Sequence, residues 1–372
     1  MIKKLGYYLF AAFFCVFRLV PVMKNKVFMV ATHDDSEEGN IGIVAKRIRE
    51  KMPEMKMVFL TKRDGIGKPF SFFFVKAYHM ATAGTIFLDN EFMPMAYTPI
   101  SKKTKVVQLW HGTGTIKKFG QDSDKGEVAK IAHRANERLS HLIVNSKMTM
   151  RQYASAFNQP AEHIYILGLP RTDLILDNER MKALRLDFWQ QYPQLKGKRC
   201  FLYAPTFRDQ EVGQPQIALD LERFIEQMAE DEVLLLRLHP HVAANCCLDI
   251  SGKYAGKLYN VSDYAGVTTL LAVADCLITD YSSIIFEYCL LNKKMIFYAY
   301  DLQQFKENGR SFYEDYESFV PGRVVYTQEE LEVECRNKTT DFALLEDFRK
   351  KMFAYLDGNA TNRLLELIFD IK

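Results

Sequence analysis

The 372-residue chain is 48% hydrophobic and 26% charged, a balance that excludes an intrinsically disordered protein and suffices for two domains of ordinary size. Its net charge is only +3, but the first 118 residues hold 19 Lys and Arg against 9 Asp and Glu. This asymmetry indicates an anionic partner: a membrane surface, a pyrophosphate-linked substrate or nucleic acid, the last ranking lowest because no recognition module is found.

Seven cysteines are scattered along the chain, with no CxxC pair and no spacing of Cys and His typical of a metal site. Several lie inside apolar runs, so we predict reduced core residues of a cytosolic protein. The sequence predicts neither a metal nor a cofactor, and no feature of it indicates an oligomeric state.

The N-terminal segment, residues 1–25, contains an apolar run, Tyr7–Phe17, that is too short to span a bilayer and is ended by Arg18. It has the charge pattern of a signal peptide, but no small-residue cleavage site follows. We predict a helix in the membrane interface with its aromatic side chains in lipid. The basic residues that would face lipid phosphates are Lys3, Lys4, Arg18, Lys24 and Lys26. The alternative is a core helix packed on the first domain.

From residue 26 onward, short apolar runs alternate with amphipathic stretches, as in a parallel, doubly wound α/β sheet. The predicted strands are 26–32, 55–61, 85–88, 105–109, 141–144 and 164–167, and the predicted helices are 39–52, 69–83, 127–139 and 147–157. The helix at 69–83 has too many aromatic residues for one apolar face. It is either buried all round, the commoner outcome, or exposed in part to lipid.

A polar, helix-rich stretch, 171–198, follows, and then the alternation starts again. The predicted strands are 199–203, 233–238, 258–260, 276–279 and 295–300, and the predicted helices are 219–228, 267–274, 284–291 and 342–371, the last broken at 357–359. We therefore predict a first α/β domain over 26–175, a linker region over 176–197 and a second α/β domain over 198–372. The cleft between two such domains, at the carboxyl ends of their strands, is the expected ligand site.

The stretch 275–301 has the pattern of strand, tight turn, helix and strand, and its turn contains Asp280, Ser282 and Ser283. Unpaired N–H groups at a helix N-terminus attract anions, so two hydroxyls beside them favour a phosphate or diphosphate site. The alternative is ordinary capping of the helix by Asp280 or a serine.

His111 follows the predicted strand 105–109, beside Trp110 and on a turn made flexible by Gly112. Histidine titrates near neutral pH, so His111 in a cleft is a candidate general base. Lys117 follows closely and could hold an anion. The alternative is a packed or surface histidine.

Other predicted strand ends carry further polar groups: Arg171 and Asp173, Thr206 and Arg208, and Arg237 and His239. Arginine donates to phosphate oxygens in a planar fork, and histidine can also donate to them. The loop 309–322 adds Arg310 among aromatic and acidic residues and could close over a ligand. No carboxylate cluster with metal spacing accompanies these groups. The predicted chemistry is therefore binding and transfer of a phosphate-bearing donor without a tightly held metal.

Taken together, these motifs resemble the CDP-glycerol glycerophosphotransferase family, the teichoic acid primases and polymerases of Gram-positive bacteria. The matching stretches, in order, are Gln108–Gly112 with Lys117, Asn145 and Ser146, Gly168–Asp173, Tyr203–Arg208, Arg237–Pro240, Thr279–Ser283, Glu287, Arg310, Pro321 and Gly322, and Asp357 and Gly358. Each is weak alone, but the ordered set is specific and covers most of the chain. A modest departure is Phe207, where the family often has Trp.

The resemblance implies a GT-B-like α/β fold, with two Rossmann-type doubly wound domains facing a central cleft. It also implies transfer of glycerol phosphate from CDP-glycerol to an acceptor hydroxyl, with release of CMP and no cofactor. His111 corresponds to the base and His239 to a second essential residue at the donor diphosphate. The donor-binding residues implied are Arg237, Thr206, Arg208, Asp280, Ser282, Ser283, Glu287 and Arg310. The acceptor-binding residues implied are Trp110, Gly112, Lys117, Asn145, Arg171 and Asp173.

The family's polymerases carry a large extra N-terminal region, of which this sequence has almost none. The resemblance therefore favours a primase that adds one glycerol phosphate to an undecaprenyl-diphosphate-linked disaccharide. The basic first half suits such an acceptor at the cytoplasmic face of the membrane, where the protein would be peripheral. Three alternatives remain open: CDP-ribitol or a polymer as substrate of the same chemistry, a GT-B glycosyltransferase using a nucleotide sugar, and a non-enzymatic membrane-bound scaffold.

Overall fold

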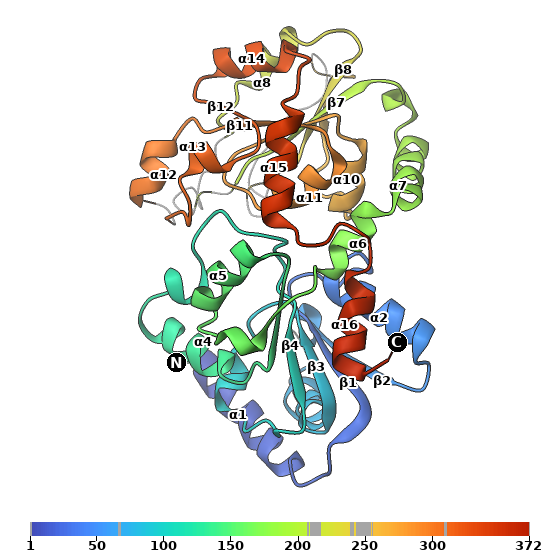
Figure 1. Ribbon diagram of the computed structural model, residues 1–372, viewed down its shortest axis with the longest axis vertical. Helices are drawn as coiled ribbons and strands as arrows, with labels where there is room; N and C mark the ends of the chain where they lie inside the picture. Colours follow the sequence, from blue (N-terminus) through green and yellow to red (C-terminus); the bar gives the residue numbers. More distant parts are fainter. Residues whose placement is uncertain are drawn as a thin grey trace. The chain divides into compact units, whose positions relative to one another are not determined.

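The computed structural model describes residues 2–65, 68–206, 208, 217–238, 242, 254, 256–308 and 311–371. These residues form two compact units (Figure 1). Unit 1 comprises Met1–Gly114, Lys118–Leu174 and Lys351–Lys372, and unit 2 comprises Thr115–Lys117 and Ile175–Lys350. Each unit therefore contains segments that are far apart in the sequence.

Unit 1 contains a six-stranded parallel sheet in the order β2-β1-β3-β4-β5-β6. Its strands are β1 (Met23–Ala31), β2 (Lys56–Thr61), β3 (Ala83–Leu88), β4 (Lys105–Gln108), β5 (His141–Val144) and β6 (Ile164–Ile166). The six strands expected from the sequence are all present. Successive residues of β1, from Val27 to Val30, are fully buried, because both faces of a parallel sheet are covered.

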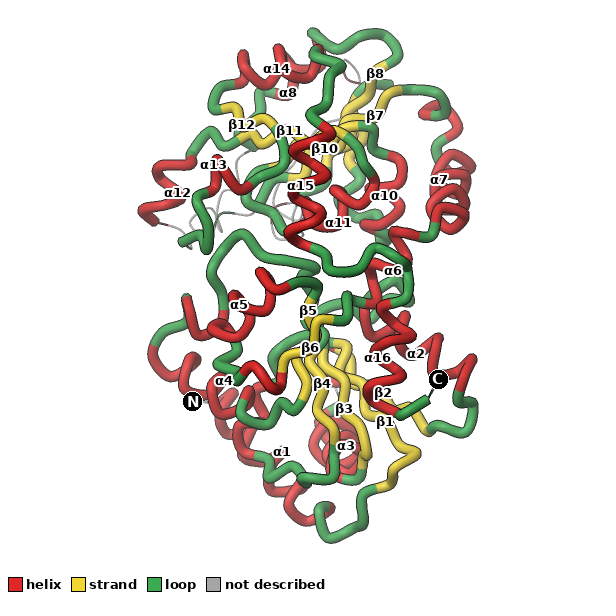
Figure 2. Tube along the Cα trace, in the orientation of Figure 1, coloured by secondary structure: helices red, strands yellow, loops and turns green. Residues whose placement is uncertain are grey.

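Helices cover this sheet (Figure 2). They are α1 (Ile2–Phe17), α2 (Asn40–Lys51), the π-helix η2 (Ser71–Lys76) with α3 (Ala77–Ala81), α4 (Gly126–Asn136), α5 (Lys147–Ala156), α6 (Pro170–Leu176) and α16 (Ala360–Phe369). None of the six side chains of η2 is fully buried. The expectation that the aromatic helix at 69–83 is buried all round is therefore wrong.

Unit 2 contains a second six-stranded parallel sheet, in the order β12-β11-β10-β7-β8-β9. Its strands are β7 (Arg199–Ala204), β8 (Glu232–Leu236), β9 (Leu258–Asn260), β10 (Cys276–Thr279), β11 (Lys294–Tyr298) and β12 (Arg323–Val325). Its helices include α7 (Asn178–Gln191), α8 (Leu221–Glu226), α10 (Val267–Val273), α11 (Ile284–Tyr288), α12 (Leu302–Asn308), α13 (Tyr316–Phe319), α14 (Gln328–Arg336) and α15 (Phe342–Met352). The sequence analysis did not predict β12, α12, α13 or α14.

The strand orders give each sheet a point at which the direction of winding reverses. In unit 1 this point lies between β1 and β3, and in unit 2 it lies between β7 and β10. Ligands of doubly wound sheets bind outside the carboxyl ends of the strands at such a point. Thr32–Asp34 and Asp89 follow the first pair of strands, and Thr206 and Asp280 follow the second.

The C-terminal helix α16 belongs to unit 1, whereas the sequence analysis placed all of 198–372 in the second domain. Its apolar residues Leu364, Leu365 and Ile368 share a core with Ile41 and Val44 of α2, and the two helices lie side by side (Figure 2). The boundary is corrected because burial of this apolar face, rather than proximity in sequence, decides where the helix packs.

The first turn of α16 is capped from another helix of unit 1. Asp173 of α6 accepts hydrogen bonds from the backbone N–H of Ala360 (2.8 Å) and Thr361 (2.7 Å) and from the Thr361 hydroxyl (2.7 Å). A carboxylate at this position satisfies N–H groups that have no partner within the helix. Asp173 therefore fastens α16 to unit 1.

Helix α1 packs on unit 1 with one face only. Phe10 and Phe14 are buried, and the Phe10 ring contacts Phe72 (centroids 5.3 Å apart) and Phe92 (5.5 Å). On the opposite face, Leu5 and Leu9 are 69% and 43% exposed. No described helix is both long and apolar enough to cross a membrane.

Candidate active site

Trp110 follows β4 in a left-handed backbone conformation, with a φ of 56°. A bulky residue in this conformation costs on the order of 1–3 kcal/mol and persists only where its surroundings impose it. The side chain of Gln108 accepts the Trp110 N–H (2.9 Å), and the side chain of Asn40 donates to the Trp110 carbonyl (3.0 Å). Two buried amides therefore hold the turn from which His111 projects.

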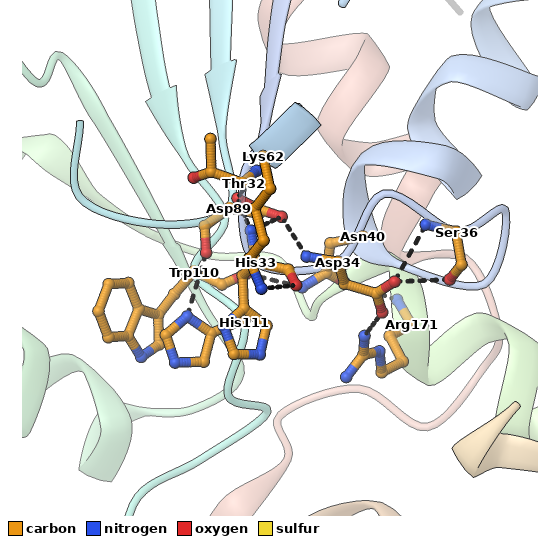
Figure 3. Close-up of polar contacts among 10 residues, drawn as sticks. All are labelled: Thr32, His33, Asp34, Ser36, Asn40, Lys62, Asp89, Trp110, His111 and Arg171. Atoms are coloured by element: carbon orange, nitrogen blue, oxygen red, sulfur yellow. Dashed lines mark hydrogen bonds and ion pairs between the residues drawn. The ribbon is translucent and has the colours of Figure 1, made fainter. Parts of the chain in front are cut away.

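The imidazole of His111 lies between two other rings (Figure 3). On one side the His33 ring is parallel to it, with centroids 3.7 Å apart and an interplanar angle of 10°. On the other side is the Trp110 indole, with centroids 4.1 Å apart and an angle of 32°. Both faces of the His111 ring are covered, so only its edge remains for a reacting group.

A hydrogen bond selects the tautomer of His111. Its Nδ1 atom lies 3.2 Å from the backbone carbonyl oxygen of Asp89. A carbonyl oxygen only accepts hydrogen bonds, so Nδ1 carries the proton of the neutral ring. The lone pair is then on Nε2, as a general base requires.

Asp89 also organises the turn after β1. Its carboxylate accepts the backbone N–H groups of Thr32 (2.9 Å), His33 (3.1 Å) and Asp34 (2.9 Å). Burial raises the pKa of Asp89, although these three N–H groups act in the opposite direction. One residue therefore fixes the backbone of His33 with its side chain and the ring of His111 with its carbonyl.

Both histidine rings are neutral at pH 7. Burial lowers the pKa of His111 from its ordinary value of 6.5 to about 3, and that of His33 to about 4. The positive charges of Lys62 and Arg171 lower both pKa values further, whereas Asp34 partly opposes them at His33. His111 is thus unprotonated at pH 7. Its pKa is not near neutrality as the sequence analysis assumed, and burial makes it a weaker base than a free imidazole.

The polar residues around this pair hold two positive charges near it. Arg171 is 9% exposed and forms an ion pair with Asp34, and its backbone N–H donates to Asn40 (2.9 Å). The exposed Lys62 donates to the backbone carbonyl of His33 (3.2 Å). Asp34 offsets the charge of Arg171, so Lys62 supplies most of the positive potential beside the two rings.

Asn145 and Gly112 were both expected to bind the acceptor, but their polar groups form hydrogen bonds within unit 1. Asn145 is 1% exposed, donates to the Thr113 carbonyl (2.5 Å) and accepts the Leu169 N–H (3.0 Å). The Gly112 carbonyl accepts the Tyr153 hydroxyl (2.9 Å). Like Asp173, these residues hold the loops around His111, and direct contact with an acceptor stays a prediction.

In unit 2, Arg208 lies in a buried ion cluster and is 9% exposed. Its guanidinium contacts Asp301 through Nε (2.7 Å) and Nη2 (2.9 Å) and Asp280 through Nη2 (2.9 Å). Burial acts to lower the Arg208 pKa, but the two carboxylates raise it above its ordinary value. Two carboxylates already surround this one guanidinium, so it has little positive potential left for a donor phosphate.

Asp280 connects two loops at the winding reversal of unit 2. It is 2% exposed and accepts the backbone N–H groups of Thr206 (2.8 Å) and Tyr281 (2.6 Å). It therefore holds the ends of β7 and β10 together and does not cap α11.

The hydroxyls near this point are less committed. Ser283 is the N-cap residue of α11 but makes no side-chain capping bond, and Ser282 accepts the Ile284 N–H at a long 3.4 Å. Within the described residues, the buried Thr206 hydroxyl has no hydrogen-bond partner. Helix capping therefore accounts for neither the Ser283 hydroxyl nor the Thr206 hydroxyl. Because α11 has only five residues, its dipole contributes less than the sequence analysis expected.

Arg237 braces the loop after β9. Its Nη1 donates to the carbonyls of Val261 (3.0 Å), Ser262 (3.2 Å) and Tyr264 (2.5 Å). A cavity of about 490 Å³ borders this loop, and its lining includes Tyr192, Asn260, Tyr264 and Thr269. Aromatic rings and amide groups in a cavity of this size suit a planar, polar ring such as a nucleobase.

Comparison with known proteins gives the family. The family model described as CDP-glycerol:poly(glycerophosphate) glycerophosphotransferase matches residues 12–370. The chain belongs to this family.

Relatives of the glycerophosphotransferase family include both primases and polymerases. A teichoic acid poly(ribitol-phosphate) polymerase of Bacillus spizizenii is 33% identical over 99% of this chain, which spans only 60% of that protein. A teichoic acid ribitol-phosphate primase of the same organism is 31% identical over 94% of this chain and 92% of its own length. For a teichoic acid glycerol-phosphate primase of Bacillus subtilis, the identity is 30% over 87% of this chain and 82% of that protein.

Among solved structures, a variant of the wall teichoic acid polymerase TagF matches with a TM-score of 0.85 at 21% identity. The match covers 98% of this chain and 93% of the TagF chain. Together with the two parallel sheets, it confirms the expected GT-B-like fold.

The structure does not place several residues implied by the glycerophosphotransferase resemblance at the candidate site. His239, Arg310 and the departure at Phe207 lie outside the described residues. Lys117, expected in the acceptor domain, belongs to unit 2, where it forms an antiparallel bridge with Phe312. Glu287 is buried in α11.

The sequence analysis missed His33, Asp34 and Asp89. Each lies one or two residues after a predicted strand, as His111 does, so the strand-end rule that selected His111 would have found them. Asp301, which binds Arg208, directly follows the predicted strand 295–300, so the same rule would have found it.

Proposed function

We propose that the protein transfers glycerol phosphate from CDP-glycerol to a hydroxyl of an undecaprenyl-diphosphate-linked disaccharide and releases CMP, as a primase does. The observation that supports this proposal most strongly is His111, whose ring is enclosed on both faces and whose Nε2 is unprotonated. Membership of the glycerophosphotransferase family supplies the class of donor.

In the proposed reaction, the acceptor oxygen attacks the glycerol-bearing phosphorus, and the bond from that phosphorus to the CMP oxygen breaks. His111 takes the hydroxyl proton through Nε2. Such a phosphoryl transfer depends on positioning and positive potential more than on covalent catalysis. No further reactant is needed to balance the step.

The donor would occupy unit 2. The hydroxyls of Ser282, Ser283 and Thr206 would contact its phosphates, and the cavity beside the loop braced by Arg237 would receive the cytosine. His239 and Arg310 are the further donor contacts that the family resemblance implies. Among the described residues, no group of three or more His, Cys, Asp and Glu side chains is placed to hold a metal ion.

CDP-ribitol is the second candidate donor. The ribitol-phosphate polymerase and primase of Bacillus spizizenii are 33% and 31% identical to this chain, against 30% for the glycerol-phosphate primase of Bacillus subtilis. These identities are too similar to separate the two polyols.

Release of CMP tests the proposal. The protein is incubated with CDP-glycerol or CDP-ribitol and a short-chain lipid-diphosphate disaccharide, and the product is analysed by mass spectrometry. One added glycerol phosphate is the expected result. A ladder of additions would make the protein a polymerase, and release from CDP-ribitol alone would change the donor. No release from either donor would contradict the transfer reaction and favour a nucleotide-sugar glycosyltransferase or a scaffold.

We also propose a peripheral position at the cytoplasmic face of the membrane, because one face of α1 is apolar and exposed. Leu5, Leu9, Ala12 and Val16 lie three or four residues apart, hence on one side of the helix, and all are exposed.

The neighbouring segment 69–76 extends this apolar surface. Its Phe70 and Phe74 are 71% and 38% exposed. The Phe74 ring packs on Phe13 and Phe17 of α1, so both elements contribute to one apolar surface. Anionic headgroups would contact the exposed Arg18 and Lys24. The expectation that Lys26 faces lipid is wrong, because Lys26 is 4% exposed and donates to the Thr82 hydroxyl (2.7 Å).

The double variant Leu9→Glu, Val16→Glu is expected to bind anionic lipid vesicles at least about 10-fold more weakly, since burial of each side chain contributes about 1.5–3 kcal/mol. Vesicle co-sedimentation measures the effect. Leu186→Glu on α7, where Leu186 is 52% exposed, is the matched control for added negative charge. Equal binding by the double variant and the wild type would refute the membrane contact.

A further inference from the structure

The contact between His33 and His111 exceeds what the proposed base catalysis requires. A general base needs a free nitrogen and a partner for the other nitrogen, and His111 has both without His33. Yet the two imidazole rings are nearly parallel, with centroids 3.7 Å apart, so they stack face to face. Together with Trp110 on the other face, His33 removes the freedom of the His111 ring to tilt.

The position of His33 is itself fixed independently of its ring. The Asp89 carboxylate binds the His33 backbone N–H (3.1 Å), and the Lys62 ammonium binds the His33 carbonyl (3.2 Å). The same Asp89 binds Nδ1 of His111 through its carbonyl. Asp89, a buried residue directly after β3, therefore fixes the positions of both rings relative to each other (Figure 3).

We propose that His33 is a positioning residue for the transfer reaction: its imidazole face fixes the plane of His111, so that Nε2 points at the acceptor hydroxyl. This inference rests on the proposed function of His111. It concerns the orientation of the base and assigns His33 no contact with either substrate.

The charges around the pair agree with this role. The titratable groups that face the two rings are Lys62, Arg171, Asp34 and Asp89. When His111 accepts a proton it becomes an imidazolium against the face of His33, which costs least if His33 is uncharged. Burial lowers the His33 pKa to about 4, so its ring is uncharged at pH 7.

Two substitutions distinguish the role of the flat His33 ring from the role of its nitrogen atoms. His33→Ala removes the stacking surface and is expected to lower kcat by about 10- to 100-fold, the scale of a misplaced catalytic group, with KM for the donor unchanged. His33→Phe restores a flat ring and is expected to recover most of kcat. Wild-type kcat in His33→Ala would overturn the proposal. So would a His33→Phe variant as slow as His33→Ala, since a polar atom of His33 would then be essential.

A measurement without substrates keeps this inference separate from the assigned reaction. Nitrogen-15 NMR of histidine-labelled protein reports the protonation of each ring nitrogen, and His111→Asn identifies the His111 signals. A His111 ring that tilts loses its hydrogen bond to the Asp89 carbonyl, and with it the preference for one tautomer. We therefore expect one Nδ1-protonated tautomer in the wild type and in His33→Phe, and a mixture of tautomers in His33→Ala. A single tautomer in His33→Ala would overturn the positioning role. A protein that shows the expected tautomers but no CMP release would instead refute the proposed function.

Discussion

His111→Asn is expected to lower kcat by about 10²- to 10⁴-fold while the protein stays folded. This is the usual contribution of a general base. Asparagine can still donate to the Asp89 carbonyl from its amide, so the contact that Nδ1 makes is largely kept. What is lost is the basic Nε2 atom. CMP release under single-turnover conditions measures the chemical step directly.

The pH dependence of the wild type gives an independent check. The pKa of His111 in the folded protein is lowered to about 3, so the base is neutral and active above that pH and is lost only as the pH falls through it. No acid limb is therefore expected near 6.5. Stability follows the same sign, because the unfolded chain binds a proton below its pKa of about 6.5. The contribution of His111 to stability is complete above that pH and decreases toward pH 3.

The matched control is His133→Asn, because the His133 side chain lies on α4 and is 43% exposed. We expect wild-type kcat for this variant. Full activity of His111→Asn, with a circular dichroism spectrum like that of the wild type, would remove His111 from the mechanism.

Arg208→Ala is expected to lower the free energy of unfolding of unit 2 by about 3–5 kcal/mol, the cost of breaking a buried ion pair. The substitution leaves the carboxylate of Asp280, 2% exposed, and that of Asp301 without their guanidinium. The sequence analysis assigned Arg208 to donor binding, and the structure adds a structural role. Urea unfolding followed by circular dichroism measures the change.

Two variants make this result specific. Arg323→Ala, at an exposed position of β12, is expected to change the unfolding free energy by no more than about 0.5 kcal/mol. Ser283→Ala should leave stability unchanged but weaken donor binding, because its hydroxyl makes no capping bond. If Arg208→Ala unfolds at the wild-type urea concentration and only raises KM, then the ion cluster is not structural.

Local sequence patterns were sufficient for most of the fold. The apolar run of β1 and the helical spacing of α2 depend on neighbouring residues only, and both elements were predicted close to their observed bounds. The strand-end rule likewise found His111, Arg171, Thr206 and Asp280, since carboxyl ends of parallel strands meet at one edge. The ordered motifs identified the family for the same reason: they are local.

Contacts between distant segments could not be read in this way. The stacking of His33 on His111 joins residues 78 positions apart. Both residues follow predicted strands, but no local pattern predicts that their rings stack. The pairing of Arg208 with Asp301 and the capping of α16 by Asp173 are of the same kind. Hydrophobic patterns state which face of an element is buried but not against what, because burial is non-directional. The sequence by itself therefore determined the fold class, the family and the candidate base. Only the tertiary structure decided which polar groups form hydrogen bonds or ion pairs within the protein and which remain available to a substrate.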